Sequence, residues 1–388
     1  MKLSARVQGI ANSPTLAITA KAKALKEAGR EIISLGAGEP DFKTPAHVKE
    51  AAIKAIEEGF TTYTATVGIQ ELREAICSSC KIERGLEYTT DQVIVSSGAK
   101  SSLFNAIQAL IDEGDEVILP APFWVSYPEQ IKFAGGKTVI VETSEENDFK
   151  MTAEGFKSAI TAKTKLVIIN SPSNPTGSVY TKDELAEIAQ IAVENDIFII
   201  SDEIYRKVSY TKEVVSIATL GEEVKKRTII IDGVSKAYAM TGWRIGYAIG
   251  PKEIIQAMGR LQSHSTSNAN SIAQKASLAA IGGTQEPTYK MVEAFKARRD
   301  IITDGINNIE GLKVNKPEGS FYIFVNVKGL LGEKIKDDYQ LVELLLEEAG
   351  VATVPGSAFG MAGYIRLSYA TSEAEINEAI KRIAKFVG

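Results

Sequence analysis

The sequence predicts an α/β protein with a large domain, whose mostly parallel sheet is sandwiched by helices, and a smaller α+β domain. Between residues 92 and 231, short apolar β-branched runs alternate with amphipathic helical stretches. This alternation is typical of parallel strands joined by right-handed helical crossovers. After Gly250 the alternation stops and the elements follow a different order. We therefore expect a large domain over 45–290, with 1–44 and 291–388 forming the small domain and its N-terminal arm.

Composition narrows the function classes. A chain of 388 residues is long enough for two domains, and its 44% hydrophobic and 24% charged content is ordinary for a folded protein. The net charge of −5 comes without a basic segment, which argues against nucleic-acid binding and a polybasic membrane patch. The N-terminal segment lacks the apolar core of a signal peptide, and no apolar run reaches membrane-spanning length. We expect a cytoplasmic protein.

The first part of the chain predicts mainly helices. The expected elements are a helix over 16–28, a strand over 32–35, a helix over 45–58 and a helix over 69–84. The glycines at 36 and 38 do not form a dinucleotide loop, because Pro40 follows and no helix opens there. They indicate either a tight turn or backbone N–H groups offered to a ligand, with Gly38 at the point of closest approach.

Metal and histidine chemistry have little support in this sequence. Cys77 and Cys80 lie three residues apart on a predicted helix, and no second pair of ligands exists for zinc. They are interpreted as packing residues. The only histidines are His47 and His264, too few for a histidine-based triad or metal cluster. We assign no role to His264.

The first strand–turn–helix unit predicts an anion site. A strand over 92–96 leads into the small-residue turn of Ser97, Gly98 and Ala99, after which a helical stripe begins. The free N–H groups and the dipole of a helix N-terminus favour a bound anion. Lys100 lies in the first turn, where the dipole disfavours a cation. A bound anion explains this lysine better than helix stability does.

Polar residues follow the later strands at equivalent positions. Strands are expected over 116–120, 138–142, 165–170, 197–201 and 228–231, with Trp124 on the loop after the first of them. Asn174, Asp202 and Lys236 each fall at or just after the C-terminal end of a strand. In open α/β sheets the ligand crevice lies outside those ends. We therefore expect the three side chains to meet in one site.

Lys236 and Arg244 carry the sharpest chemical hypothesis. The strand over 228–231 is expected to stop at Asp232-Gly233, which is a turn signal. A lysine just past a buried strand can lose hydration, and its neutral amine then attacks carbonyl groups to form Schiff bases. Arg244 would bind an anionic group on the same molecule. The alternative is a solvated loop lysine beside a surface ion pair.

The C-terminal part predicts helices followed by a mixed unit. Residues 251–310 are expected to be mostly helical, with a polar interruption at 263–271 and a long helix over 287–309. The remaining expected elements are strands in 311–314, 319–327, 351–360 and 364–370, and helices over 338–349 and 372–386. The N-terminal arm is expected to pack on this unit.

Seven segments, taken in order and spacing, resemble the fold type I pyridoxal-phosphate (PLP) aminotransferases of class I, and especially the bacterial aspartate aminotransferases. The resemblance covers nearly the whole chain. The segments are GEPDF at 38–42, YTATVGIQELR at 63–73, FWVSYP at 123–128, NSPSNPTG at 170–177, SDEIY at 201–205, GVSKAYAMTGWRIGY at 233–247 and YIRLSYATS at 364–372.

The resemblance implies a role for each matching residue. Lys236 would hold PLP covalently and move a proton between Cα and C4′, and Asp202 would pair with the ring nitrogen. Asn174 and Tyr205 would bind the phenolic oxygen, and Trp124 would stack on the ring. The phosphate would be bound by Arg244 and the turn of Ser97, Gly98, Ala99 and Lys100, together with Tyr63 from a partner subunit, so that a homodimer shares its active sites.

The same resemblance implies amino-acid and 2-oxo-acid substrates. Arg366 would grip the α-carboxylate, aided by Gly38, Trp124 and Asn174. Lys100 would neutralise the distal carboxylate of aspartate or glutamate, although it could instead bind only phosphate. Ser13 and Thr15 of the N-terminal arm are further candidates. Prephenate-accepting relatives carry a lysine where this chain has Ala11, which makes that activity less expected.

The expected reaction is transfer of the amino group of L-aspartate to 2-oxoglutarate by a ping-pong mechanism. The alternatives are an aminotransferase of aromatic, alanine or prephenate specificity, or another fold type I PLP enzyme such as a β-lyase or decarboxylase. A PLP-sensing regulatory protein would need a DNA-binding module, for which the chain offers neither spare length nor basic charge.

Overall fold

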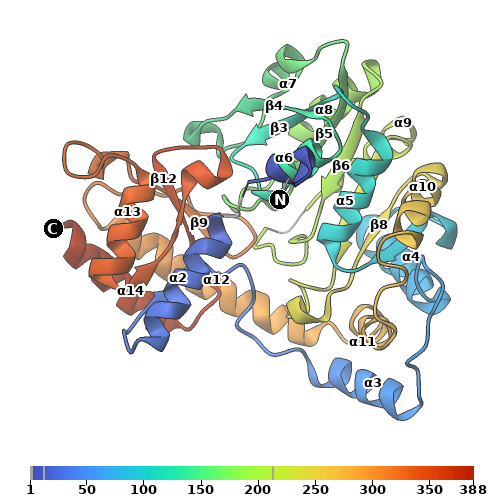
Figure 1. The fold of residues 1–388 in the computed structure, drawn as a ribbon, viewed down its shortest axis with the longest axis horizontal. Coiled ribbons are helices and arrows are strands. Elements are labelled where there is room, and N and C mark those ends of the chain that lie inside the picture. Colours follow the sequence, from blue (N-terminus) through green and yellow to red (C-terminus); the bar gives the residue numbers. More distant parts are fainter. Residues whose placement is uncertain (1–2, 12–13, 212–213) are drawn as a thin grey trace.

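The computed structural model describes residues 3–11, 14–211 and 214–388. Its centre is a seven-stranded sheet of order β2-β8-β7-β6-β5-β3-β4 (Figure 1). The strands are β2 (Val93–Ser96), β3 (Glu116–Ala121), β4 (Lys137–Glu142), β5 (Thr164–Asn170), β6 (Phe198–Asp202), β7 (Thr228–Gly233) and β8 (Gly246–Ile249). Neighbours are parallel except for β8, which runs antiparallel to both β2 and β7. The mostly parallel sheet is confirmed, and β8 is a strand that the sequence pattern did not reveal.

Helices cover both faces of this sheet (Figure 1). Alternate residues of each strand face opposite sides, so Ile168 packs with α5, α6 and α10, whereas Val167 packs with α7 and α8. The other half of the second face is covered by α3, α4 and α11. The bounds are α3 (Ala46–Glu57), α4 (Gln70–Arg84), α5 (Ala99–Leu110), α6 (Ser126–Phe133), α7 (Ala153–Ala159), α8 (Lys182–Glu194), α9 (Glu222–Lys225), α10 (Lys252–Ser263) and α11 (Ser271–Gly282).

The end of β7 corrects one expectation. Asp232 and Gly233 do not form a turn; they extend the strand, because they pair with Tyr247 and Gly246 of β8. The added antiparallel neighbour gives both residues backbone partners. Gly246 has a further reason to be glycine, since a Cβ there would lie 2.0 Å from the backbone nitrogen of Ala99. The start of β8 therefore packs against the start of α5.

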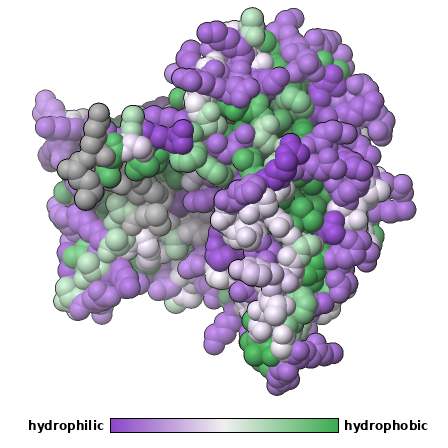
Figure 2. Space-filling model, turned by 45° about the vertical axis from the view of Figure 1, so that its right-hand side comes forward, coloured by the Kyte–Doolittle hydropathy of each residue, from purple (hydrophilic) through white to green (hydrophobic). Residues whose placement is uncertain are grey.

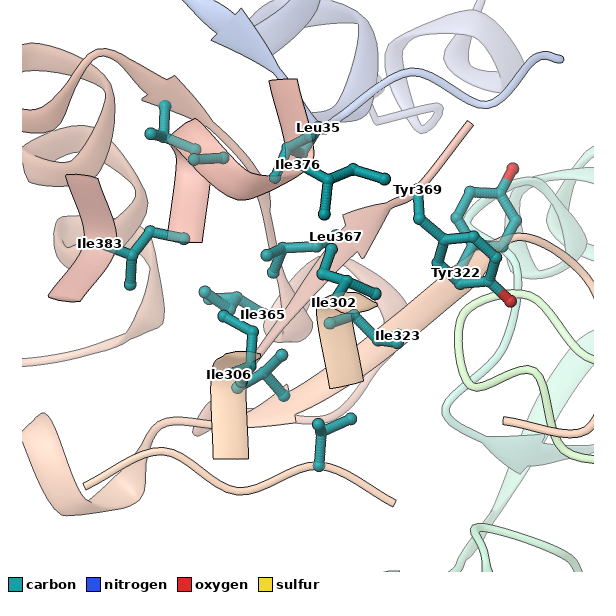
Figure 3. Close-up of a cluster of buried hydrophobic side chains, with 14 of the residues drawn as sticks. Leu35, Ile302, Ile306, Tyr322, Ile323, Ile365, Leu367, Tyr369, Ile376 and Ile383 are labelled. Atoms are coloured by element: carbon teal, nitrogen blue, oxygen red, sulfur yellow. The ribbon is translucent and has the colours of Figure 1, made fainter. Parts of the chain in front are cut away.

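A second core lies around two smaller sheets. Strands β11, β12 and β9 form an antiparallel sheet, and β1 pairs in parallel with β10. Figure 3 shows their apolar side chains packed between α12 and α14. The bounds are α1 (Ala5–Gln8), α2 (Pro14–Glu27), α12 (Glu286–Asn307), α13 (Asp338–Leu344), α14 (Glu373–Val387), β1 (Ile33–Ser34), β9 (Tyr322–Asn326), β10 (Val351–Ala352), β11 (Val354–Pro355) and β12 (Tyr364–Ser368).

The N-terminal segment joins this second core. β1 extends the chain beside β10, and α2 lies against β10 and β11. The remaining short elements are 3-10 turns at Thr90–Gln92, Glu145–Asn147, Ile217–Thr219, Thr241–Trp243, Lys328–Leu330 and Gly356–Phe359, and a π-helical turn at Leu345–Ala349. Within the described ranges, no helix is both long and apolar enough to cross a membrane. Cys80 is buried and Cys77 half-buried among α3, α4 and α11, both as free thiols.

Candidate active site

A cavity of about 340 Å³ opens at the C-terminal ends of β5 and β6, where the sequence places the ligand crevice. Its size is typical of a small-molecule site. The predicted residues that line it come from both parts of the chain: Gly38, Ala99, Lys100, Trp124, Asn174, Asp202, Tyr205, Lys236, Arg244 and Arg366. Thr15 also lines it, whereas Ser13 lies outside the described residues.

Lys236 is half-buried three residues beyond β7. Its Nζ donates a hydrogen bond to the carbonyl oxygen of Gly38 at 2.6 Å. Burial lowers the pKa of Lys236 to about 8; Arg366 and Arg244 act in the same direction, against the attraction of Glu39 and Asp202. A lysine with this pKa is substantially neutral near pH 8, so its amine is available as a nucleophile or base.

Asp202 ends β6 and is 6% exposed. Burial raises the pKa of its carboxyl to about 6, although the hydroxyl of Tyr127 donates to Oδ2 at 2.7 Å and the backbone N–H of Ile204 donates to Oδ1 at 3.2 Å. No Lys or Arg forms an ion pair with it among the residues that the structure describes. A buried carboxylate without an ion-pair partner favours the binding of a cationic group of a ligand.

Arg244 lies across the turn that precedes α5. Its Nη2 is 3.5 Å from the carbonyl oxygen of Ser97, and its Nη1 donates to the carbonyl oxygen of Thr241 at 2.9 Å. Gly98 has φ 91°, and a Cβ at that position would lie 2.4 Å from Arg244 Nη2. Only glycine therefore lets the guanidinium approach the turn this closely.

The start of α5 offers free donors beside this guanidinium. No side chain caps the helix, and its first backbone bond runs from the N–H of Ser101 to the carbonyl oxygen of Gly98 at 2.9 Å. The N–H groups of Ala99 and Lys100 have no partner in the described part of the chain. Together with the arginine they form an anion cradle.

Arg366 is a buried cation on β12, 3% exposed. Its Nη1 donates to Asn174 Oδ1 at 2.9 Å and its Nη2 to the carbonyl oxygen of Gly36 at 2.8 Å. The guanidinium stacks 4.3 Å from the ring centroid of Tyr322. Its Nε has no hydrogen-bond partner, and no carboxylate within the described ranges pairs with it. A buried guanidinium without a carboxylate partner favours the binding of an anionic group of a ligand.

Lys100 in the first turn of α5 and Trp124 on the loop before α6 meet in the lining of the cavity. The Nζ of Lys100 lies 4.8 Å from the centroid of the Trp124 ring. Burial lowers the pKa of Lys100, and the nearby charge of Arg244 lowers it further. Both effects disfavour an unpaired cation here, so a second anionic group would be stabilised at this place.

Three predicted residues, Ser97, Gly98 and Tyr63, do not line the cavity; Gly98 lies instead against the guanidinium of Arg244. Ser97 contributes its carbonyl oxygen to Arg244 rather than a side chain to the lining. Tyr63 is 90% exposed and does not line the cavity of its own chain. Its loop is nevertheless ordered by a buried glutamine: Gln274 donates to Thr64 Oγ1 at 3.0 Å and accepts from the N–H of Ile69 at 2.8 Å.

Among the lining residues that sequence reasoning missed, three lie next to predicted site residues. Tyr127 binds Asp202, Tyr322 places its hydroxyl 3.1 Å from that of Tyr205, and Ser235 precedes Lys236. A signal existed for Tyr127, because it lies one helical turn after Trp124. No local signal marks Tyr322, whose hydroxyl would lie 3.0 Å from a Cβ at Gly38, so its role depends on tertiary packing.

The charge balance of the cavity defines the class of protein. Among the residues that the structure describes, its lining holds four basic side chains, Lys100, Lys236, Arg244 and Arg366, and one carboxylate, Asp202. Fold and site together define an enzyme that binds small molecules with several negative charges next to a lysine able to react as a neutral amine.

The chain belongs to the aminotransferases of class I and II, whose family description matches residues 30–383. It is 52% identical to an aspartate aminotransferase of Bacillus subtilis, with 100% of this chain and 99% of the relative covered. It is 48% identical to an aspartate/prephenate aminotransferase of Nitrosomonas europaea, with both chains fully covered. The solved aspartate aminotransferase of Thermus thermophilus with maleate is 44% identical, with a TM-score of 0.95 and 99% of each chain covered. The α/β fold type I architecture is confirmed by this likeness.

Proposed function

We propose that this protein is a PLP-dependent aminotransferase that moves the amino group of L-aspartate to 2-oxoglutarate by a ping-pong mechanism. The observation that carries the proposal is the excess of basic over acidic side chains in the described lining of the cavity, four against one. A cofactor phosphate and the two carboxylates of a dicarboxylic substrate are anionic groups that these basic side chains would bind. The names of the relatives support aspartate as the donor.

The residues present fit PLP. Arg244 and the turn of Ser97, Gly98, Ala99 and Lys100 would bind the phosphate, because this cradle leaves backbone donors free and admits no Cβ at Gly98. Asp202 would bind the protonated ring nitrogen, which supplies the cation that the buried carboxylate lacks. The phenolic oxygen would accept from Asn174 and Tyr205, the ring would stack on Trp124, and Lys236 would hold the cofactor covalently.

When bound, PLP supplies an aldehyde that links covalently to amino groups and a protonated ring that stabilises negative charge at the substrate Cα. Lys236, once released from the cofactor, would take the proton from Cα, and its lowered pKa of about 8 makes it an effective base at neutral to weakly alkaline pH. Asp202 would keep the ring nitrogen protonated. Tyr205, whose pKa burial raises far above its ordinary value, would stay a neutral hydrogen-bond donor.

Arg366 would fix the α-carboxylate, with the Gly38 backbone, Asn174 and Trp124 around it. Lys100 would meet the distal carboxylate across the cavity. Since the same pocket must accept aspartate first and 2-oxoglutarate second, and both carry two carboxylates, one set of cations serves both half-reactions. This sharing is why a ping-pong order is expected.

A homodimer completes the proposal. Tyr63 is exposed on an ordered loop, and Ile53 and Ile56 of α3 are also exposed. Figure 2 shows hydrophobic residues in a broken band on a largely hydrophilic surface. An exposed apolar band of this kind is suited to a second copy, whose phosphate cradle Tyr63 would then reach. The two-domain division at about residues 45 and 290 and the cytoplasmic location also remain predictions.

Half-reactions test the proposed function. Protein incubated with PLP is expected to become yellow, to retain cofactor on Lys236 after borohydride reduction, and to lose its absorption band with L-aspartate while oxaloacetate forms. Alanine, tyrosine and cysteine form the comparison panel, and product analysis separates transamination from β-elimination or decarboxylation. Protein that stays colourless after incubation with PLP would refute the proposal, and a preference for tyrosine or alanine would refute the aspartate assignment.

Substituting Lys100 with alanine tests the distal-carboxylate contact. We expect kcat/KM for aspartate to fall by about 10- to 100-fold, the value of one charge-assisted hydrogen bond. The rate with alanine as donor should hardly change, since alanine has no distal carboxylate. Lys290→Ala, at an exposed lysine of α12 paired with Glu286, serves as the control. An unchanged preference for aspartate over alanine, combined with weaker PLP binding, would assign Lys100 to the phosphate alone.

A further inference from the structure

Two buried acids lie directly behind Asp202. Glu203 is the next residue and is 3% exposed, and Asp232 is 8% exposed on β7, beside the strand that ends at Asp202. Neither lines the cavity. Two buried carboxylates this close to a third would strongly disfavour its ionised form, so their compensation bears on the state of Asp202.

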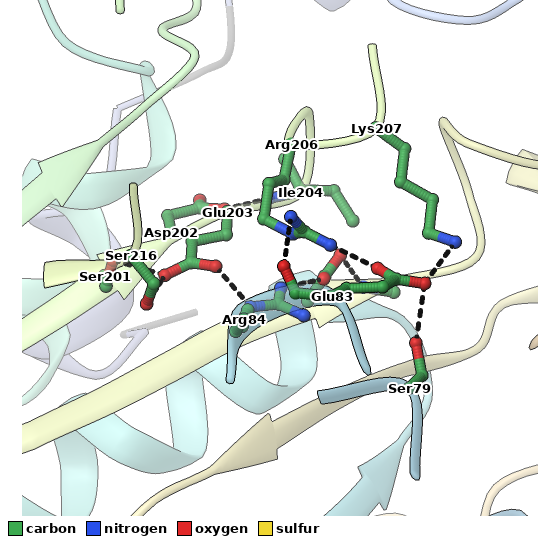
Figure 4. A network of polar contacts seen from close by, with 12 residues as sticks. Ser79, Glu83, Arg84, Ser201, Asp202, Glu203, Ile204, Arg206, Lys207 and Ser216 are labelled. Carbon is green, nitrogen blue, oxygen red and sulfur yellow. Dashed lines mark hydrogen bonds and ion pairs between the residues drawn. The ribbon is translucent and has the colours of Figure 1, made fainter. Parts of the chain in front are cut away.

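Arg84 binds both of these acids. It is the last residue of α4, and its side chain is 2% exposed. Nε donates to Glu203 Oε2 at 2.7 Å, and Nη2 donates to Asp232 Oδ2 at 2.6 Å. Figure 4 shows Arg84 beneath the segment that follows β6, within hydrogen-bonding reach of Glu203. One guanidinium thus joins the ends of two adjacent strands.

Each acid of the surrounding network accepts hydrogen bonds. Glu203 Oε1 accepts from Ser201 and Ser216, and Asp232 Oδ1 accepts from the N–H of Gly233 at 2.7 Å. A second group lies beside it, in which Glu83 binds Arg206 and Lys207. The three acids and three bases of the two groups balance in charge. A buried cluster of paired charges is costly to disturb, because removing one partner leaves a desolvated charge unpaired.

The strands that Arg84 joins carry the two central residues of the site. Asp202 precedes Glu203 by one position, and Lys236 follows Asp232 by four. We propose that Arg84 is a positioning residue of the active site: it fixes the ends of β6 and β7 and cancels the charge of the two acids behind Asp202, so that Asp202 remains ionised for the cofactor. The role of an ionised Asp202, which is to bind the ring nitrogen of the cofactor, rests on the proposed PLP chemistry.

The groups around Asp202 decide in which direction its pKa would shift if one of them were removed. Burial is the main cause of its raised pKa, and Asp232 and Glu203 raise the pKa further. The other titratable groups that face it are Tyr127 from α6, Tyr205 from the segment after β6, and Lys236 from the segment after β7. Arg84 offsets the charges of Asp232 and Glu203. Its loss should therefore raise the pKa of Asp202, whereas neutralising Glu203 should lower that pKa.

The test measures the titration midpoint of Asp202 in the full chain without cofactor, by ¹³C NMR of protein labelled at aspartate carboxyls and assigned with Asp202→Asn. The wild-type midpoint is expected at about 6. Arg84→Met should raise it by about one unit or more, and Glu203→Gln should lower it by about half a unit. The matched control is Arg227→Met, which removes the arginine paired with Glu223 and Asp196 at the opposite end of β7.

Opposite shifts in the two variants support the inference, since a merely structural role would not move the midpoint in two directions. Midpoints that stay within about 0.2 units of the wild type, or that shift the same way, overturn it. If Arg84→Met does not fold, Arg84→Lys takes its place and is expected to raise the midpoint by a smaller amount, because an ammonium group cannot bind Glu203 and Asp232 as the guanidinium fork does. The pH dependence of PLP affinity is measured in parallel. Failure of the wild type to bind PLP would refute the proposed function while leaving the NMR result to judge Arg84.

Discussion

Replacing Lys236 with alanine is expected to lower kcat for aspartate by about 10⁴-fold or more, because one substitution removes both the covalent anchor and the base that takes the Cα proton. The geometry supports a single residue in both roles. Lys236 lies just past β7 with its Nζ donating to the carbonyl oxygen of Gly38, and its pKa is lowered to about 8 mainly by burial. Single-turnover absorbance changes with aspartate provide the measurement.

The Lys236→Arg variant distinguishes the positive charge of Lys236 from its ability to transfer a proton. Arginine keeps a cation in the same place but does not deprotonate at neutral pH, so its loss of activity should match that of the alanine variant. Lys275→Ala, at a lysine that binds Glu71 between α11 and α4, is the matched control and should retain wild-type activity. A variant at position 236 that keeps more than about a tenth of the activity would contradict the role, since general base catalysis alone is worth about 10²-fold or more.

The fold was largely predictable because its strong signals are local. β5, β6 and β7 are runs of β-branched residues buried on both faces, so their pattern is readable without knowing their neighbours. The strand β8 was missed for the opposite reason: only four residues long and beginning at Gly246, it is a strand because β2 and β7 flank it. The same unseen neighbour explains why β7 continues through Asp232 and Gly233.

The candidate site also has residues that the sequence could predict and residues that it could not. Asn174, Asp202 and Lys236 were predictable together because the ends of parallel strands converge at one edge of a sheet. Tyr322 and Arg84 were not, since each acts across elements: one from β9 onto Arg366 and Tyr205, the other from α4 onto β6 and β7. The position of Tyr63 against a partner subunit stays a prediction, because a single chain shows only its exposure.

Arg366→Lys is expected to lower kcat/KM for aspartate by about 10²- to 10³-fold while leaving PLP binding intact, since truncating a buried charged anchor costs about 3–5 kcal/mol. Lysine keeps the charge but cannot donate at once to Asn174 and Gly36 and present a planar fork to a carboxylate. The stacking on Tyr322 is lost as well, because it requires the flat guanidinium. The effect should appear with alanine as donor too, which distinguishes this α-carboxylate contact from that of Lys100.

Arg298→Lys is a closely matched control for this substitution. Arg298 is 9% exposed, binds Asp41 at 2.7 Å and lies over the rings of Phe42 and Phe295, yet it does not line the cavity. It should therefore lose stability in thermal unfolding without a selective rise in KM. If both variants lose activity in proportion to their stability, Arg366 is a structural arginine like Arg298, and the α-carboxylate must bind elsewhere in the cavity.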